Sequence, residues 1–296
     1  MTVTHIGELA ALTTALCWTI SALSFERAGR LSGSFATNVV RMVMALFMLG
    51  AFLLMYRGHF WPTGATSHQW IWLSISGIVG FFVGDLFLFK AYTVIGSRIT
   101  QVVMTLVPPI SALVAWITMG EVLSAMSFFA MSLIVAGIAL VFWRRGKAEQ
   151  GQKISLKGLL LAIGGAAGQA VGLVLSKIGI ESYDAVAATQ IRTISGLAFF
   201  LAATFLLQKG PLIRSAVRNT ESLLYIFLGS LFGPVIGVSL SLYAVQHTDT
   251  GIASSIMALV PIFIIIPSVL LFKQPVTKSE WAGAIISVAG VAIFFN

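Results

Sequence analysis

VMTLVP, at residues 103–108, is repeated as IMALVP at residues 256–261, with Met, Leu, Val and Pro in register. The same offset of 153 positions pairs small residues of the two halves, namely Gly80, Gly84, Ala91 and Gly137 with Gly233, Gly237, Ala244 and Gly290. The chain therefore contains two copies of one sequence repeat. A proline inside an apolar run bends its helix, so Pro108 and Pro261 are predicted to act as matched hinges.

The composition places most of this chain in lipid. Hydrophobic residues make up 58% of the 296 residues, charged residues only 9%, and the mean hydropathy is +0.97. Lys and Arg lie in short connections between apolar runs, so the net charge of +8 indicates membrane orientation and not nucleic-acid binding. The single cysteine, Cys17, excludes an internal disulfide and a Cys-rich metal site.

Dividing the chain at polar and turn residues gives ten apolar runs of roughly the 17 to 25 residues that a bilayer requires. They are residues 8–26, 35–56, 69–92, 99–118, 124–143, 156–178, 185–208, 222–245, 252–272 and 279–295. We therefore predict an all-α integral membrane protein with ten transmembrane helices. Its parts are a first five-helix repeat (1–148), a cytoplasmic linker (149–155) and a second five-helix repeat (156–296).

An odd number of spans in each half predicts that the two repeats are inverted, because the second half must then enter the membrane from the opposite side. Inverted repeats place a binding site near mid-depth where the halves meet, an arrangement recurrent in secondary transporters. We therefore expect a central cavity. Glycines at four-residue spacing in the third and eighth spans indicate close helix packing.

The distribution of Lys and Arg predicts the orientation. The loops after the odd-numbered spans carry 13 of these residues, and the loops on the other side carry only Arg57 and Lys177. By the positive-inside rule the linker is cytoplasmic and both termini lie outside. The expected location is the plasma membrane, which is the inner membrane of a bacterium.

Several features fall in a recognisable order along both halves. They are a Gly-led first span with Trp18, an Arg partway into the second span (Arg41 and Arg192), the Leu-Val-Pro of the fourth and ninth spans, and Gly120-Glu121. With these features the chain resembles an EamA-type member of the drug/metabolite transporter superfamily over nearly its whole length. The resemblance implies ten helices, a cavity between the halves and carriage of small metabolites such as amino acids, often outward. Two features depart from it: Lys273-Gln274 replaces Gly120-Glu121 in the second half, and members often keep their termini in the cytoplasm.

Four charged residues lie inside predicted spans, where a charge costs about 2.5 to 3.5 kcal/mol at mid-helix. Arg41 and Arg192 are equivalent at an offset of 151, each about two turns into its span, and inversion predicts that they lie near opposite faces of the membrane. Each either attracts a substrate carboxylate or phosphate at a mouth of the pathway, or snorkels and ties helix ends together. Asp85 is either a proton carrier for coupling or the partner of a fixed ion pair with Arg41 or Lys90. Lys90 either holds a substrate carboxylate or snorkels.

Uncharged polar and aromatic side chains complete the candidate substrate-binding set. They are Trp18, Asn38, Tyr92, Gln101, Gln169, Gln190 and Tyr243. A buried amide needs hydrogen-bond partners, which either a cavity or a neighbouring helix supplies. The tyrosines either line the cavity or belong to the interfacial aromatic belt. Met104 and Met257, next to the repeated prolines, would form an adaptable wall.

The sequence carries no pattern typical of catalysis. The four histidines are scattered without metal-ligand spacing, and no Gly-rich phosphate loop follows a strand. We therefore predict no catalytic residue, no metal site, no cofactor and no enzymatic activity.

The predicted function is secondary transport of a small polar metabolite by alternating access. An amino acid or a related zwitterionic or anionic solute is expected, and family habit favours export. Three cations against one acid inside the spans favour a substrate with at least one negative group. The expected partners are this substrate, the lipid bilayer and protons as the candidate coupling ion, and the protein is expected to be a monomer. Alternatives are an uptake carrier, a lipid-headgroup translocator, a membrane sensor or an integral membrane enzyme.

Overall fold

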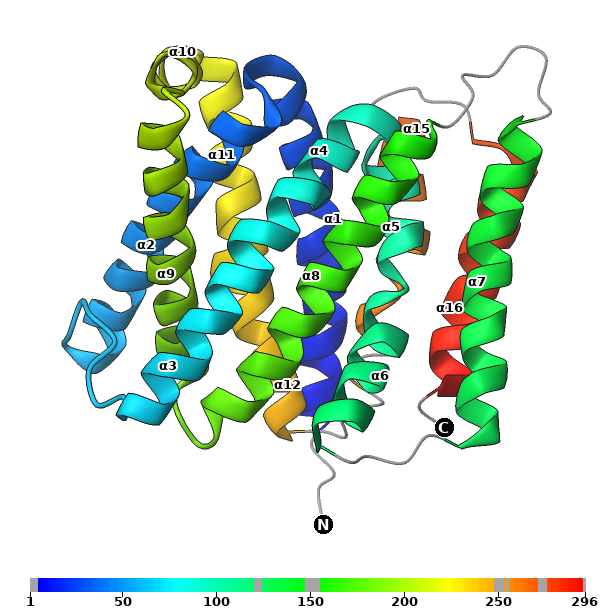
Figure 1. The fold of residues 1–296 in the computed structure, drawn as a ribbon, viewed down its shortest axis with the longest axis horizontal. Coiled ribbons are helices and arrows are strands. Elements are labelled where there is room, and N and C mark those ends of the chain that lie inside the picture. Colours follow the sequence, from blue (N-terminus) through cyan, green and yellow to red (C-terminus); the bar gives the residue numbers. More distant parts are fainter. Residues whose placement is uncertain are drawn as a thin grey trace.

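The computed structural model describes residues 5–119, 124–146, 155–247, 253, 256–270 and 276–294, and these residues form helices and turns without any strand. Most helices stand upright beside one another (Figure 1). In chain order they are α1 (Ile6–Ser32), α2 (Ser34–Arg57), α3 (Ser67–Ser76), η1 (Gly77–Gly84), α4 (Asp85–Ile95), α5 (Ser97–Met104), α6 (Val107–Met119), α7 (Ala125–Gly146), α8 (Leu156–Ile180), α9 (Ala185–Leu206), α10 (Gly210–Arg218), α11 (Thr220–Ser230), η2 (Leu231–Val238), α12 (Ser239–His247), α14 (Val260–Phe263), α15 (Ile265–Leu270) and α16 (Lys278–Phe294).

Seven helical segments of the described chain are long and apolar enough to cross a membrane. They are Ile6–Ser32, Ser34–Arg57, Ser67–Ile95, Ser97–Thr118, Leu156–Ile180, Ala185–Leu206 and Thr220–Ala244. Shorter apolar helices at Ala125–Val141 and Val260–Leu270, together with α16, occupy the predicted fifth, ninth and tenth spans. The prediction of an all-helical membrane protein is thus confirmed, and the count of ten crossing helices stays a prediction. Gly120-Glu121, Lys273-Gln274 and residues 149–154 of the linker lie outside the described residues.

In each half the third span contains eight residues wound as a π-helix, η1 in the first half and η2 in the second. When η1 is shifted by the repeat offset of 153 positions, it falls within one residue of η2. Glycines weaken the regular winding in both, and Pro234 in η2 has no backbone N–H to donate. π-helical turns are rare and often mark functional sites. The sequence predicted close packing here but not this change of winding.

The glycine faces of the third spans pack across the boundary between the halves. A Cβ added at Gly168 of α8 would lie 2.5 Å from the Cα of Gly84, and one at Gly172 would lie 2.9 Å from the Cα of Gly80. In the second half, a Cβ at Gly233 would lie 2.5 Å from the hydroxyl oxygen of Ser21 in α1. The third span of each half therefore packs against the first span of the other half, and the predicted close packing is confirmed.

Two further contacts between the halves join equivalent spans. α2 packs against α9, and α7 packs against α16 at one edge of the molecule (Figure 1). The Ser287 hydroxyl of α16 donates to the Ile134 carbonyl of α7 at 3.3 Å. Second span thus meets second span and fifth meets fifth, which is the pattern that a two-fold relation between the halves produces.

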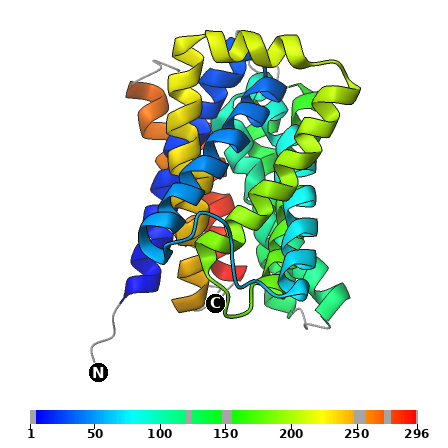
Figure 2. The same cartoon turned by 90° about the vertical axis from the view of Figure 1, so that its left-hand side faces the viewer.

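Different helices lie at the two ends of the bundle. The start of α1 and the end of α16 lie at one end, and α10 lies across the helices at the other (Figures 1 and 2). α10 is short, and the basic side chains of Arg214 and Arg218 are exposed on it, with Lys209 just before it over the ring of Phe35. We refer to these as the α1-start end and the α10 end.

Candidate functional site

A cavity of about 930 Å³ lies between the two halves. Its lining includes most of the predicted substrate-binding, coupling and hinge residues, namely Trp18, Arg41, Asp85, Tyr92, Gln101, Pro108, Gln169, Arg192 and Pro261. Met104 and Met257 line it as well. The repeated stretch at residues 103–108 and 256–261 therefore contributes to the cavity wall from each half.

The remaining predicted substrate-binding residues lie outside this lining. Lys90 is exposed on α4, and Asn38 is fully buried behind Arg41. Gln190 is also fully buried and donates to the Phe60 carbonyl at 2.9 Å. Tyr243 is partly buried and stacks on His247, with 3.9 Å between the ring centroids.

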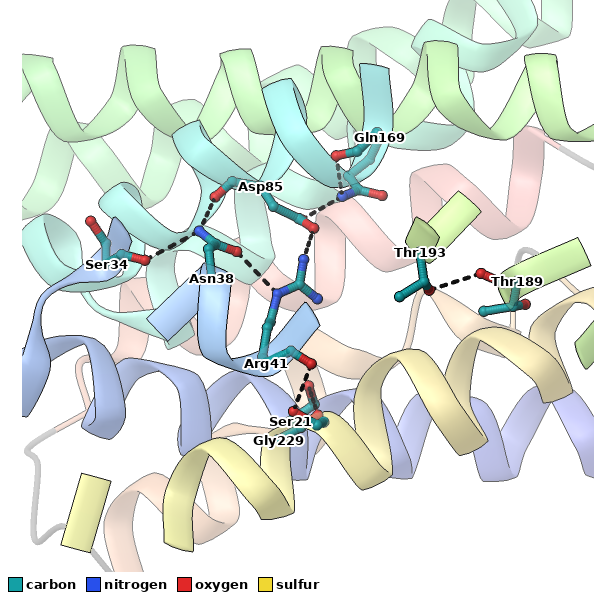
Figure 3. Close-up of polar contacts among 11 residues, drawn as sticks. Ser21, Ser34, Asn38, Arg41, Asp85, Gln169, Thr189, Thr193 and Gly229 are labelled. Atoms are coloured by element: carbon teal, nitrogen blue, oxygen red, sulfur yellow. Dashed lines mark hydrogen bonds and ion pairs between the residues drawn. The ribbon is translucent and has the colours of Figure 1, made fainter. Parts of the chain in front are cut away.

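Arg41 and Asp85 form a buried ion pair in the lining of the cavity (Figure 3). Arg41 lies on α2 and Asp85 is the first residue of α4, directly after η1, and both side chains are at most 5% exposed. Asp85 was expected to be either a proton carrier or the partner of a fixed ion pair, and the structure shows the ion pair with Arg41. A buried pair of this kind is stable only when further hydrogen bonds satisfy both groups.

Asn38 and Gln169 supply those hydrogen bonds. Arg41 Nε donates to Asn38 Oδ1 at 3.0 Å, and the Asn38 amide donates to the Asp85 carbonyl at 3.1 Å (Figure 3). Gln169 of α8 donates through Nε2 to Asp85 Oδ1 at 2.7 Å. Both carboxylate oxygens are therefore engaged, and the network joins the two halves.

Arg192 of α9 lies beside the same ion pair. Its guanidinium carbon is 4.3 Å from the centroid of the Phe81 ring, and that of Arg41 is 5.9 Å from the same ring. Arg192 interacts electrostatically with Asp85. Its Nε is buried and has no hydrogen-bond partner in the described part of the chain.

The two arginines thus meet at one aromatic ring, and the expectation that they lie near opposite faces of the membrane is wrong. Each is seven residues into its helix, which puts its Cα roughly 10 Å from the helix start. Because α2 and α9 run in opposite directions (Figure 1), this depth places the two Cα atoms at different heights in the bundle. The side chains nevertheless converge, because α2 packs against α9 and a long guanidinium side chain can span the remaining distance.

Aromatic rings surround the Arg41 guanidinium. Its central carbon is 4.6 Å from the Phe89 centroid and 5.5 Å from the Phe25 centroid. Cations over aromatic faces at such distances are stabilised, and more strongly when desolvated. Sequence reasoning missed Phe25, Phe81 and Phe89, because the chain contains 21 phenylalanines and nothing in their spacing singles these out.

The cavity extends toward the α1-start end. Lys177, Glu181, Ser182 and His247 belong to its lining, and the α8–α9 turn that carries Glu181 lies at that end (Figure 1). Beside it, Tyr183 donates to the Thr63 carbonyl at 3.0 Å, and burial raises the pKa of Tyr183. We call this region of the cavity its mouth.

The α10 end is tied by buried polar contacts. Glu26 of α1 accepts hydrogen bonds from the Ser97 amide at 2.6 Å and the Ser97 hydroxyl at 2.5 Å, and it pairs with Arg30 at 2.8 Å. Arg98 pairs with Glu280 of α16 at 3.1 Å. The predicted first span stopped at Glu26, whereas α1 continues to Ser32, so this acid lies inside the helix. Helices α1, α5 and α16 are therefore joined at the end opposite the mouth.

The EamA-like transporter family matches residues 5–143 and again residues 156–296. The chain belongs to the EamA-like transporter family. The resemblance drawn from the sequence is thus confirmed, and so is the twofold occurrence of the family unit. This EamA-like transporter is a multi-pass membrane protein, as its apolar helices also indicate.

One curated protein and one solved structure are also similar to this chain. The "Uncharacterized transporter YvbV" of Bacillus subtilis (strain 168) is 26% identical over 186 residues, which cover 63% of this chain and 59% of that protein. The match therefore spans less than two thirds of the relative's length. A solved structure described as "Crystal structure of protein" shares the fold, with a TM-score of 0.66 and 18% sequence identity. The match covers 97% of this chain and 95% of the chain in that structure.

Proposed function

We propose that this EamA-like transporter is a secondary carrier that moves a small polar metabolite through the central cavity by alternating access. The observation that carries the proposal is the buried charged cluster in the cavity, to which the first half contributes Arg41 and Asp85 and the second half Gln169 and Arg192. Reciprocal packing of the halves supports ten crossing helices arranged as inverted repeats, with the site at their junction.

Alternating access requires a state that is open at one end and closed at the other. The mouth near Glu181 and the contacts of Glu26 with Ser97 at the α10 end supply such an arrangement. Transport would then break the Glu26 contacts while the mouth closes, with bends near Pro108 and Pro261 taking up the change. An amino acid or a related zwitterionic or anionic solute is the proposed cargo, and export is the proposed direction.

Counterflow into proteoliposomes tests the transport function. Vesicles containing the purified protein are preloaded with a mixture of amino acids and organic acids, and uptake of each labelled solute is followed. Accelerated uptake that requires the same solute inside is expected of a carrier. Protein-free vesicles are the control, and equal uptake with and without protein for every solute would reject the proposal.

We propose protons as the coupling ion and Asp85 as their carrier. Protonation would remove the charge that holds Arg41 and would loosen α2 from α4. Asp85→Asn keeps the shape of the side chain, and it is expected to abolish accumulation driven by a proton gradient while solute exchange continues. The measurement compares driven uptake with exchange in proteoliposomes; driven uptake at the wild-type level would exclude Asp85 as the carrier.

We propose an orientation with the α1-start end outside and the α10 end in the cytoplasm, because exposed basic residues gather at the α10 end. Ser67 begins α3 near the mouth and Ser215 lies on α10, and both are exposed. In a Cys17→Ser background, an impermeant maleimide applied to whole cells is expected to label Ser67→Cys and not Ser215→Cys. Labelling of both after cell lysis is the control. The reverse pattern would show that the termini are cytoplasmic.

A further inference from the structure

We propose that the ligand of the central cavity is an organic monocarboxylate whose remaining part is uncharged, and that Arg192 binds its carboxylate. This inference rests on the proposed transport function, because it takes the cavity to be the substrate site. It narrows the cargo from zwitterionic or anionic solutes to net monoanions.

The state of the Arg192 guanidinium provides the first argument. The residue is 4% exposed and lines the cavity, and its buried Nε has no hydrogen-bond partner in the part of the chain that the structure describes. A guanidinium carries five N–H donors in a planar fork that matches a carboxylate, and burying such donors without partners is costly. A ligand carboxylate would supply the missing acceptors. The ring of Phe81, 4.3 Å away, would keep the guanidinium in place.

The charges of the buried cluster provide the second argument. Asp85 pairs with Arg41 through one carboxylate oxygen and accepts from Gln169 through the other. The two arginines of the cluster therefore face a single acid, and both oxygens of that acid are already taken by Arg41 and Gln169. One negative charge on the ligand balances the cluster, whereas a doubly charged phosphate would need a second unpaired cation.

The surroundings of the cluster disfavour a ligand ammonium group. The rings of Phe25, Phe81 and Phe89 already have an arginine over them. Glu181 is the other acid among the described lining residues, but it lies at the mouth and its side chain is 57% exposed. Its Oε1 is 3.6 Å from Nδ1 of His68. An ammonium beside Arg192 would therefore meet like charges, which repel it in a desolvated site.

The rest of the lining suits an apolar ligand body. Many of its side chains carry no polar group, including Leu88, Met104, Val107, Ala112 and Leu173. Such a wall favours apolar carbon chains over hydroxylated ones, because a buried hydroxyl without a partner costs free energy. Met104 can adapt to ligands of different shape.

Three small molecules that share one branched chain test the inference on the wild-type protein. They are 4-methylpentanoate, L-leucine, which adds an α-ammonium group, and 3-methylbutylamine, which has no carboxylate. Calorimetric titration of the purified protein in detergent is expected to show 4-methylpentanoate binding at least about tenfold more tightly than leucine, and no binding of the amine. Leucine binding as tightly as the carboxylate, or binding of none of the three, would overturn the inference.

Variants assign the contact to Arg192. Arg192→Gln is expected to abolish carboxylate binding, and Arg192→Lys to weaken it, because the charge stays while the planar fork is lost. Arg218→Gln on α10 removes an equal charge far from the cavity and should bind like the wild type. Binding retained by a folded Arg192→Gln variant would contradict the assignment. The comparison of the three ligands holds even where a variant fails to fold.

Transport assays separate this inference from the proposed function. Counterflow of leucine without counterflow of 4-methylpentanoate would overturn the monocarboxylate inference and leave the carrier function standing. Tight binding of 4-methylpentanoate without counterflow of any solute would overturn the carrier function and leave the binding site standing.

Discussion

Asp85→Leu is expected to lower the free energy of unfolding by about 3 to 5 kcal/mol, because it leaves Arg41 as a buried charge without its partner. Both side chains of the pair are at most 5% exposed, so solvation compensates little for the lost carboxylate. Arg41→Met is expected to lower the free energy of unfolding for the same reason, because it leaves Asp85 as a buried charge without its partner. Equilibrium unfolding in mixed detergent micelles measures each change.

The double variant Arg41→Met/Asp85→Leu distinguishes a charge effect from a packing effect. Replacing both partners by apolar side chains of similar size often costs little, so the double variant is expected to be more stable than either single variant. Glu221→Leu is the matched control, because the pair of Glu221 with Arg27 is exposed, and little change is expected there. If the losses of the two single variants simply add, the pair is not a coupled unit.

Gly168→Ala is expected to destabilise the protein by about 1 to 3 kcal/mol, despite the better helix propensity of alanine. The new methyl group would lie 2.5 Å from the Cα and 2.9 Å from the nitrogen of Gly84, and backbone atoms cannot rotate aside. α8 must then move away from η1. Because the next residue, Gln169, holds Asp85, ligand binding should weaken as well. Thermal unfolding and ligand titration measure the two effects.

Gly210→Ala is the matched control for this substitution. No atom lies within 4 Å of a Cβ placed at Gly210, which begins α10. Stability and binding are therefore expected to be unchanged. A Gly168→Ala protein as stable as the Gly210→Ala protein would show that the two helices can separate at no cost.

The fold was largely predictable because lipid imposes strong constraints on sequence. Apolar runs of sufficient length located the helices, and the repeat at residues 103–108 and 256–261 located the two halves. The π-helical winding of η1 and η2 was not predictable, since glycine and proline indicate irregularity without specifying its form. The end of α1 was also missed, because polar residues continue a helix that has left the apolar region.

The candidate site was predictable in its residue types but not in its geometry. Arg41, Asp85 and Arg192 stood out because charges inside apolar spans are costly, and Gln169 stood out as a mid-span amide. Their convergence on one cluster depends on helix tilt and side-chain reach, which sequence position does not report. Lys90 illustrates the same limit, because its rotation about the axis of α4 turns it outward.

The packing of α7 against α16 also determines when the two halves can assemble along this edge of the bundle. Ser287 and Ile134, which join the two helices, are separated by 153 positions. At translation rates of 5 to 20 residues per second, roughly 8 to 30 seconds pass between their synthesis. During that time the face of α7 around Gly137, which packs against Gly283 and Ser287 of α16, must be covered by lipid or by the insertion machinery. The two halves therefore join along this edge only after α16 has been synthesised, so this contact is a late step in assembly of the protein.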